Sequence, residues 1–151
     1  MRYYTGIGSR KTPFHILKIM SQISEKLESM RYTLRSGGAG GADSAFEVGA
    51  KIKEIYIASD ATFKAMQVAH KFDPAWNKCP TFVKKLHGRN AFQVLGKDLK
   101  TPSHFVICWT PDGATTHAER SIKTGGTGTA ISIANHYKIP VFNLARPDHL
   151  K

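Results

Sequence analysis

The stretch Ser36-Gly37-Gly38-Ala39-Gly40-Gly41-Ala42-Asp43 joins a short apolar run, Tyr32 to Arg35, to a helix-like segment, Ala42 to Lys51. A turn without Cβ atoms lets backbone N–H groups approach an anion closely, and the helix that follows presents unpaired N–H groups and the positive end of its dipole. This order of strand, glycine turn and helix is typical of an α/β fold with a phosphate-binding loop. The alternative is that the glycines only make a tight turn.

A second turn of the same kind, Thr124-Gly125-Gly126-Thr127-Gly128-Thr129-Ala130, precedes a helix predicted over Ala130 to Tyr137. Neither turn matches G-x-x-x-x-G-K-[ST], and the first only loosely resembles G-x-G-x-x-G, so each motif alone is a weak signal. Two such turns on one small sheet, both with Ser or Thr hydroxyls, favour phosphate binding over turn formation alone.

The rest of the chain alternates between strand-like and helix-like segments. Strands are predicted at Tyr3 to Ile7, Ile55 to Ala58, His104 to Thr110 and Ile139 to Leu144, and helices at Pro13 to Met30 with Thr12 as N-cap, Ala61 to Lys71, Thr81 to Leu86 and Asn90 to Leu95. This alternation predicts one α/β domain over residues 1–151, a Rossmann-like three-layer sandwich with a mainly parallel sheet flanked by helices. Ligands of such sheets bind at the carboxyl ends of the strands.

The chain is strongly basic. Its 151 residues include 22 Lys and Arg against 11 Asp and Glu, a formal charge of +11 that favours polyanions or phosphorylated ligands as partners. The basic residues are dispersed along the sequence, so no linear nucleic-acid arm is present, and solubility alone is the alternative explanation.

Composition also limits localisation and metal chemistry. The sequence has no apolar leader and no stretch of about 18 apolar residues, so we expect a cytoplasmic protein without a membrane partner. Cys79 and Cys108 form no disulfide framework or metal-type cluster, and the seven histidines lack H-x-x-x-H spacing. We therefore expect no metal and no cofactor.

The candidate ligand-binding residues gather at four predicted turns and at the start of one predicted helical segment. Ser9 and Arg10 could hold a phosphate, Arg89 and Asn90 a phosphate and a base edge, and Asp43 either a sugar hydroxyl or the end of its helix. The full set is Gly8, Ser9, Arg10, Arg35, Ser36, Gly37, Gly38, Ala39, Gly40, Gly41, Asp43, Arg89, Asn90, Thr110, Gly125, Gly126, Thr127, Gly128 and Thr129.

The ordered motifs carry a family resemblance. The segments that carry it are Gly8-Ser9-Arg10, Ser36 to Asp43, Arg89-Asn90, Thr124 to Ala130 and Pro140-Val141-Phe142. In this order they resemble the Rossmann-like domain of DNA-processing protein A (DprA/Smf), in the DprA/Lonely Guy (SLOG) superfamily, and small stand-alone DprA-like proteins of phages and bacteria. The resemblance implies a nucleotide or nucleotide-derived small molecule, or single-stranded DNA, as partner, and a homodimer or higher homo-oligomer.

The resemblance leaves three functions open. Lonely Guy enzymes, which are nucleotide phosphoribohydrolases, carry Pro-Gly-Gly-x-Gly-Thr-x-x-Glu with a catalytic Glu and an upstream Arg, whereas this chain has Thr124 and Ser132 at the Pro and Glu positions. Binding of a nucleotide or nucleotide signal therefore comes first, single-stranded DNA binding second and nucleoside monophosphate N-glycosidase activity third. Catalytic candidates are Arg89, Glu47 and Glu119, the last with His117 as an acid–base partner.

Overall fold

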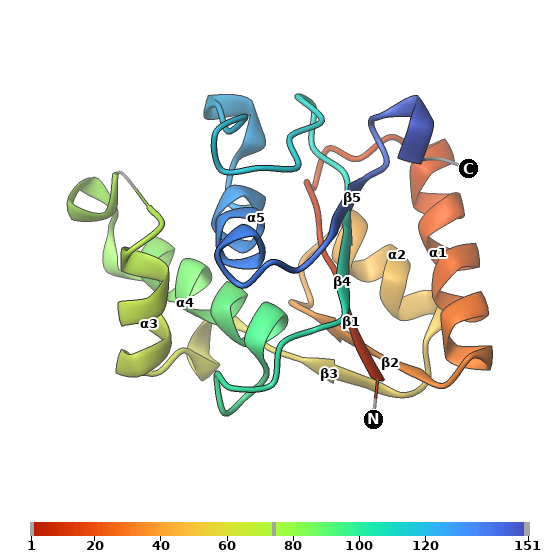
Figure 1. The fold of residues 1–151 in the computed structure, drawn as a ribbon, viewed down its shortest axis with the longest axis horizontal. Coiled ribbons are helices and arrows are strands. Elements are labelled where there is room, and N and C mark those ends of the chain that lie inside the picture. The colour runs from red at the N-terminus through yellow and green to blue at the C-terminus, as the bar shows by residue number, and fades with distance from the viewer. Residues whose placement is uncertain (1, 74, 150–151) are drawn as a thin grey trace.

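The computed structural model describes residues 2–73 and 75–149, and these contain a five-stranded, all-parallel sheet. The strands are β1 (Arg2–Gly6), β2 (Tyr32–Ser36), β3 (Lys53–Ile55), β4 (Phe105–Cys108) and β5 (Val141–Asn143), in the spatial order β3-β2-β1-β4-β5 (Figure 1). Helices cover both faces, so the predicted Rossmann-like three-layer sandwich with a parallel sheet is confirmed.

The winding of the chain fixes where a ligand can bind. From β1 the chain proceeds outward through β2 to β3, then returns to the other side of β1 for β4 and β5. In the register, Thr5 of β1 lies opposite Arg35 of β2 on one side and Val106 of β4 on the other. The strand order therefore reverses between β1 and β4, and ligands of open α/β sheets bind outside the carboxyl ends of the strands at such a switch point.

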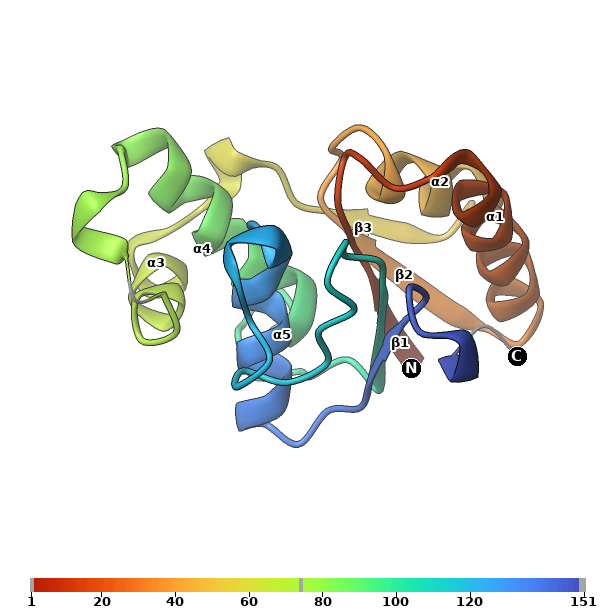
Figure 2. The same cartoon turned by 90° about the horizontal axis from the view of Figure 1, so that it is seen from above.

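A different pair of helices covers each face of the sheet. One face of the sheet is covered by α1 (Phe14–Ser29) and α2 (Ala42–Gly49), and the other by α4 (Thr81–Leu95) and α5 (Thr127–His136). Helix α3 (Phe63–His70) packs against α4 on the outside of the second layer (Figures 1 and 2). No helix among the described residues is long and apolar enough to cross a membrane.

Each face of the sheet has its own apolar core. Tyr4 and Leu34 belong to the core shared with α1 and α2, whereas Val106 and Cys108 belong to the core shared with α4 and α5. Because successive side chains of a strand alternate between faces, a sheet buried on both sides reads as a continuous apolar run. This explains why the apolar run from His104 to Thr110 correctly predicted strand β4.

The third strand begins two residues earlier than predicted. Lys53 and Glu54 pair with Leu34 and Arg35, while Tyr56 follows the strand and is buried. The sequence pattern favoured the apolar residues, but β3 lies at the edge of the sheet, where charged side chains are tolerated. Glu54 Oε1 lies 3.2 Å from Arg35 Nε, and this ion pair helps to fix the register.

Helix boundaries also differ from the predictions. The two predicted helical pieces form one helix, α4, which continues through Gly88. A Cβ at this position would lie 2.8 Å from Met66 Cγ of α3, so the glycine allows the two helices to pack closely. Helix α5 begins at Thr127, inside the second glycine turn. Thr12 is not the N-cap of α1: that residue is Pro13, and Thr12 Oγ1 donates to Ser9 O instead.

Candidate functional site

A cavity of about 470 Å³ opens at the carboxyl edge of the sheet, the edge seen from above in Figure 2. It lies between the loop after β1, the two glycine turns and α4. The predicted residues among those that line it are Gly8, Ser9, Arg10, Ala39, Asp43, Arg89, Asn90, Gly125, Gly126 and Thr127. The structure thus brings together four motifs that are far apart in the sequence.

The first wall of the cavity is the loop after β1. Ile7 N–H donates to Ile107 O and Ser9 N–H to Trp109 O, both at 3.1 Å, so β1 and β4 stay paired beyond the strands. Gly41 has a φ of 78°, and a Cβ there would lie 2.8 Å from Ser9 O. Only glycine allows the first glycine turn to approach this loop so closely.

The second wall is α4, and Arg89 is its central cation. Arg89 Nη1 donates to Gly37 O at 2.6 Å, and Nε donates to Asn90 Oδ1 at 3.1 Å. A Cβ on Gly37 would lie 2.6 Å from Nη1, so the glycine turn wraps around the guanidinium. Within the described residues, Nη2 makes no hydrogen bond. Arg89 therefore keeps donors for a ligand in the cavity.

Asp43 is a buried carboxylate beside this guanidinium. It is 2 % exposed, and its Oδ2 accepts from Ala39 N–H at 3.3 Å. Among the described residues, Oδ1 has no hydrogen-bond partner. The side chain does not cap α2, whose N-cap is Gly41, so the helix-capping interpretation is wrong. Burial raises the pKa of Asp43 to about 6, and the attraction of Arg89 opposes this shift.

The raised pKa of Asp43 predicts a pH-dependent stability. The folded state holds this proton up to about pH 6, whereas the unfolded chain releases it near 3.8. Stability should therefore fall as pH rises from about 4 to 6, by about 2 to 3 kcal/mol in total. Urea unfolding at pH 4.5 and pH 7 would measure this change.

The Asp43→Asn variant provides the comparison, because its side chain is isosteric and does not titrate. Every other ionisable group is common to both proteins, so its contribution cancels in the difference between the two pH profiles. We expect the wild type to lose stability relative to Asp43→Asn between pH 4.5 and pH 7. Parallel profiles would contradict the assignment of a raised pKa to Asp43.

The second glycine turn forms the third wall. Asn90 Nδ2 donates to Gly126 O at 2.9 Å, which joins α4 to the turn. A Cβ on Gly126 would meet nothing within 4 Å, and its φ is −63°, so neither packing nor conformation requires glycine there. The missing side chain leaves the backbone at the start of α5 open to the cavity, an arrangement suited to an anion.

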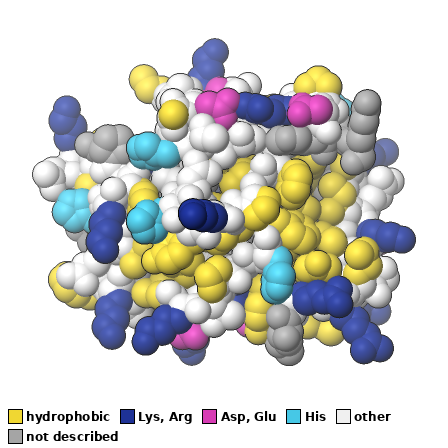
Figure 3. Space-filling model, viewed as in Figure 1, with side chains coloured by type: hydrophobic (Ala, Val, Ile, Leu, Met, Phe, Trp, Pro, Cys, Tyr) yellow, Lys and Arg dark blue, Asp and Glu magenta, His cyan; other side chains and the backbone are white. Residues whose placement is uncertain are grey.

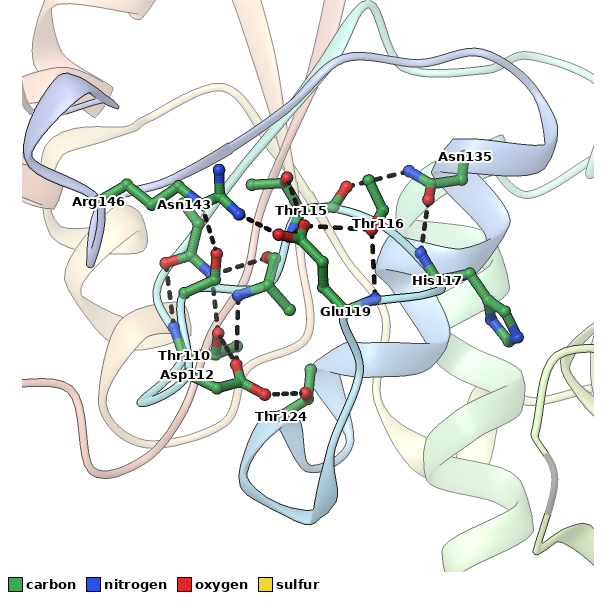
Figure 4. A network of polar contacts seen from close by, with 12 residues as sticks. Thr110, Asp112, Thr115, Thr116, His117, Glu119, Thr124, Asn135, Asn143 and Arg146 are labelled. Atoms are coloured by element: carbon green, nitrogen blue, oxygen red, sulfur yellow. Dashed lines mark hydrogen bonds and ion pairs between the residues drawn. The ribbon is translucent and has the colours of Figure 1, made fainter.

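The loop that leads into this turn is held by a polar network (Figure 4). Asp112 accepts hydrogen bonds from Thr110, Ser121 and Thr124. Partial burial alone would raise the pKa of Asp112, but these bonds lower it to about 2. Thr110 does not line the cavity: its hydroxyl also accepts from Asn143 Nδ2 at 2.7 Å. The structure therefore gives Thr110 a role in holding the loop.

Arg35 does not reach the cavity. It is 2 % exposed, its Nη1 donates to Thr101 O and Ser103 Oγ, and its guanidinium lies 3.8 Å from the centre of the Tyr3 ring. Together with the Glu54 ion pair, these contacts tie β2 to β3 and to the segment before β4. The expected role of Arg35 in phosphate binding is replaced by a structural one.

The other catalytic candidates also lie away from the cavity lining. Glu119 accepts from Thr115 and Thr116 and pairs with Arg146; the Thr115 backbone bond, followed by the hydroxyl bonds, lowers its pKa to about 2. In Figure 4 the ring of His117 points away from Glu119, so the two do not form an acid–base pair. Glu47, on α2, is likewise not a lining residue.

The remaining predicted positions lie outside the cavity lining. Ser132 lies at the Glu position of the Lonely Guy pattern, but its hydroxyl bonds to His117 Nδ1 and Arg120 Nη1. At Gly128 a Cβ would lie 2.4 Å from Arg120 Nε, so this glycine serves packing. Besides Arg35 and Thr110, the predicted residues outside the lining are Ser36, Gly37, Gly38, Gly40, Gly41, Gly128 and Thr129.

The sequence analysis missed one face of α4. Phe82, Val83, Leu86 and His87 line the cavity together with Arg89 and Asn90, at the three- and four-residue spacing of a helical face. Phe82 is 66 % exposed at this site. The spacing could have revealed this face, but dividing the helix at Gly88 hid it. Lys123 and Thr124, just before the second turn, complete the lining.

Charge in the cavity is predominantly positive. The described lining contains three cationic side chains, those of Arg10, Arg89 and Lys123, and one carboxylate, that of Asp43.

Neither a scan against protein-family models nor searches of curated proteins and of solved structures found a match for this chain. The class of protein defined here by fold and site is an α/β protein with a basic cavity at its topological switch point.

Proposed function

We propose that the cavity binds a nucleotide or a nucleotide-derived small molecule. The observation that carries this proposal is the unpartnered Oδ1 of buried Asp43 within an otherwise basic cavity. Arg10, Lys123 and the second glycine turn offer charge and open backbone to a phosphate, while Asp43 offers an acceptor to a hydroxyl group. Few metabolites other than nucleotides and sugar phosphates carry both groups close together.

The carboxylate distinguishes this site from a simple phosphate site. An ionised carboxylate next to a bound phosphate would repel it, but a carboxylate that accepts from a sugar hydroxyl is the usual partner of a ribose in nucleotide-binding α/β folds. A buried acceptor left unpaired costs about 1 to 3 kcal/mol, which a ligand hydroxyl would recover.

The remaining part of the cavity suits a base. Phe82 is exposed at the lining, beside Val83 and Leu86, and an aromatic face can stack on any base. The cavity volume of about 470 Å³ is within the range of small-molecule sites. A mononucleotide thus finds a basic region, a hydroxyl acceptor and an apolar wall in one cavity.

Calorimetric titration with nucleoside monophosphates, their 2′-deoxy forms and inorganic phosphate tests this function. We expect a ribonucleotide to bind, and Asp43→Asn to weaken it about 10-fold or more, with a smaller effect on inorganic phosphate. Glu25→Gln, an exposed carboxylate on α1, is the control and should bind as the wild type does. Equal affinities of Asp43→Asn and wild type for every ligand would contradict the proposed role of Asp43.

Single-stranded DNA is the second candidate, favoured by the charge of +11. Lys and Arg side chains are distributed over the face seen in Figure 3, so this face offers positive charge to phosphates but no single basic groove. An oligonucleotide that binds through several phosphates should lose affinity steeply as salt increases. Such behaviour, without mononucleotide binding, would replace the first proposal.

Chromatography of the same mixtures distinguishes binding from hydrolysis. In the described lining the one carboxylate is Asp43, and a carboxyl group that titrates near neutral pH is suited to proton transfer. Intact nucleotide would support a sensing or sequestering protein. Release of free base that Asp43→Asn abolishes would identify an N-glycosidase instead.

A further inference from the structure

Three metal-ligand side chains from separate segments meet beside the nucleotide cavity. They are Asp73, which follows α3, Cys79, which ends a short 3-10 turn (Trp76–Lys78), and His87 of α4. One ligand atom from each lies within 4.8 Å of the other two. The spacing of these residues matches no sequence motif for a metal, so the cluster could not be predicted from the sequence.

The separations within the cluster suit a tetrahedral cation. His87 Nε2 lies 3.4 Å from Asp73 Oδ2, and Cys79 Sγ lies 3.7 Å from the same oxygen. Zinc bonds of about 2.0 to 2.3 Å at tetrahedral angles place neighbouring ligand atoms roughly 3.3 to 3.7 Å apart. These two separations already match a zinc site, and the third, between Cys79 and His87, is within 4.8 Å.

Two further contacts orient the ligands from behind. His87 Nδ1 lies 2.8 Å from Thr129 Oγ1, which leaves Nε2 to face the cluster. Ala75 N–H donates to Asp73 Oδ1 at 3.0 Å, which leaves Oδ2 to face it. Metal-bound histidines and carboxylates usually have such outer partners, which fix the tautomer and the rotamer.

Burial and charge are compatible with a divalent ion. The side chains of Asp73 and His87 are 7 % and 12 % exposed. A carboxylate and a thiolate together balance the two charges of zinc, so the nearby Arg120 would face a neutral centre. The mixture of sulfur, nitrogen and oxygen ligands favours zinc over magnesium or calcium, which prefer oxygen alone.

We propose that Asp73, Cys79 and His87 form a zinc-binding site with three protein ligands. The site lines an adjacent cavity of about 460 Å³, which shares His87, Gly125 and Gly126 with the nucleotide cavity. A fourth ligand has access from this cavity, as in zinc sites that keep an open position. The inference does not depend on the proposed nucleotide function: His87 lines both cavities, but the nucleotide proposal assigns no role to any of the three ligands.

Metal titration of the full chain, freed of metal by a chelator and kept without nucleotide or phosphate, tests the site. Zinc should bind with one ion per chain in competition with a chromophoric chelator, and cobalt should give the thiolate charge-transfer absorption. Cys79→Ser should abolish that absorption and weaken zinc at least about 100-fold, beyond the 10- to 100-fold effect of losing an outer partner. His87→Gln should also weaken zinc strongly.

His15→Gln, an exposed histidine on α1, is the matched control and should bind zinc as the wild type does. Alkylation of the wild type gives a second readout that needs no variant, because Cys108 is 0 % exposed and only Cys79 should react in the folded protein. Zinc should slow this reaction at least tenfold. Absence of stoichiometric zinc binding, unchanged affinity in Cys79→Ser, or unprotected alkylation would overturn the proposal.

Discussion

Replacement of Arg89 by methionine is expected to weaken mononucleotide binding at least about 100-fold. Charge-assisted hydrogen bonds contribute about 1.5 to 3 kcal/mol each, and 2.7 kcal/mol corresponds to a factor of 100. Arg89 is the cation that joins both parts of the site: it holds the first glycine turn through Gly37 O and attracts the buried carboxylate of Asp43. Calorimetry on the purified variant measures the loss.

The same substitution should also affect stability, and a second variant separates the two effects. Without the guanidinium, Asp43 is a buried carboxylate with no opposing charge, so the Arg89→Met variant should unfold at a lower temperature than the wild type. Adding Asp43→Asn removes that charge and should restore part of the melting temperature, but not ligand binding. A double variant that binds mononucleotides normally would contradict the role of Arg89 in the site.

Arg2→Met is the matched control for Arg89. Arg2 is exposed on β1, at the amino end of the sheet and so at the edge opposite the cavity. Its replacement lowers the net charge by the same amount without touching the cavity. We expect it to leave mononucleotide affinity within about twofold. An equal loss in both variants would show that overall charge, rather than the site, determines binding.

Gly49→Ala is expected to destabilise the fold by about 3 kcal/mol, the upper end of the usual cost of overpacking. Gly49 is the last residue of α2, and a Cβ there would lie 2.0 Å from Ser24 Oγ and 2.3 Å from Ser21 O of α1. The two helices are in close contact at this point, since Ser21 Oγ donates to Ala45 O at 2.8 Å. The melting temperature should fall by roughly 6 to 12 °C.

Gly40→Ala is the control for this substitution, because a Cβ at Gly40 would meet nothing within 4 Å and φ is not positive. Its stability should stay within about 0.5 kcal/mol of the wild type. Ser24→Ala combined with Gly49→Ala removes the closest contact but leaves the Ser21 carbonyl, so recovery should be partial. If Gly49→Ala were as stable as Gly40→Ala, the close contact between α1 and α2 would be contradicted.

The sequence predicted the fold class because its signals are local. A glycine turn between a strand and a helix depends only on backbone conformation, and alternating segments imply parallel strands joined by crossovers. Carboxyl ends of parallel strands meet at one edge, which is why Ser9, Arg10, Asp43 and Gly126 could be assigned to one site before their positions were known. The predicted helix division at Gly88 was wrong, because the packing of α4 against its neighbours outweighs the low helix propensity of one glycine.

The sequence by itself thus determined the parallel α/β architecture. It also predicted an anionic ligand at the carboxyl edge of the sheet, where the structure has a basic cavity. Only the tertiary structure decided which charged groups are available there. The guanidinium of Arg35 is already paired with Glu54 and Thr101, whereas Oδ1 of Asp43 has no hydrogen-bond partner among the described residues. The partners of a side chain depend on strand register, on burial and on which distant segments of the chain pack together. The contact between Asp73 and His87 is of this kind, because it joins α4 to the loop after α3.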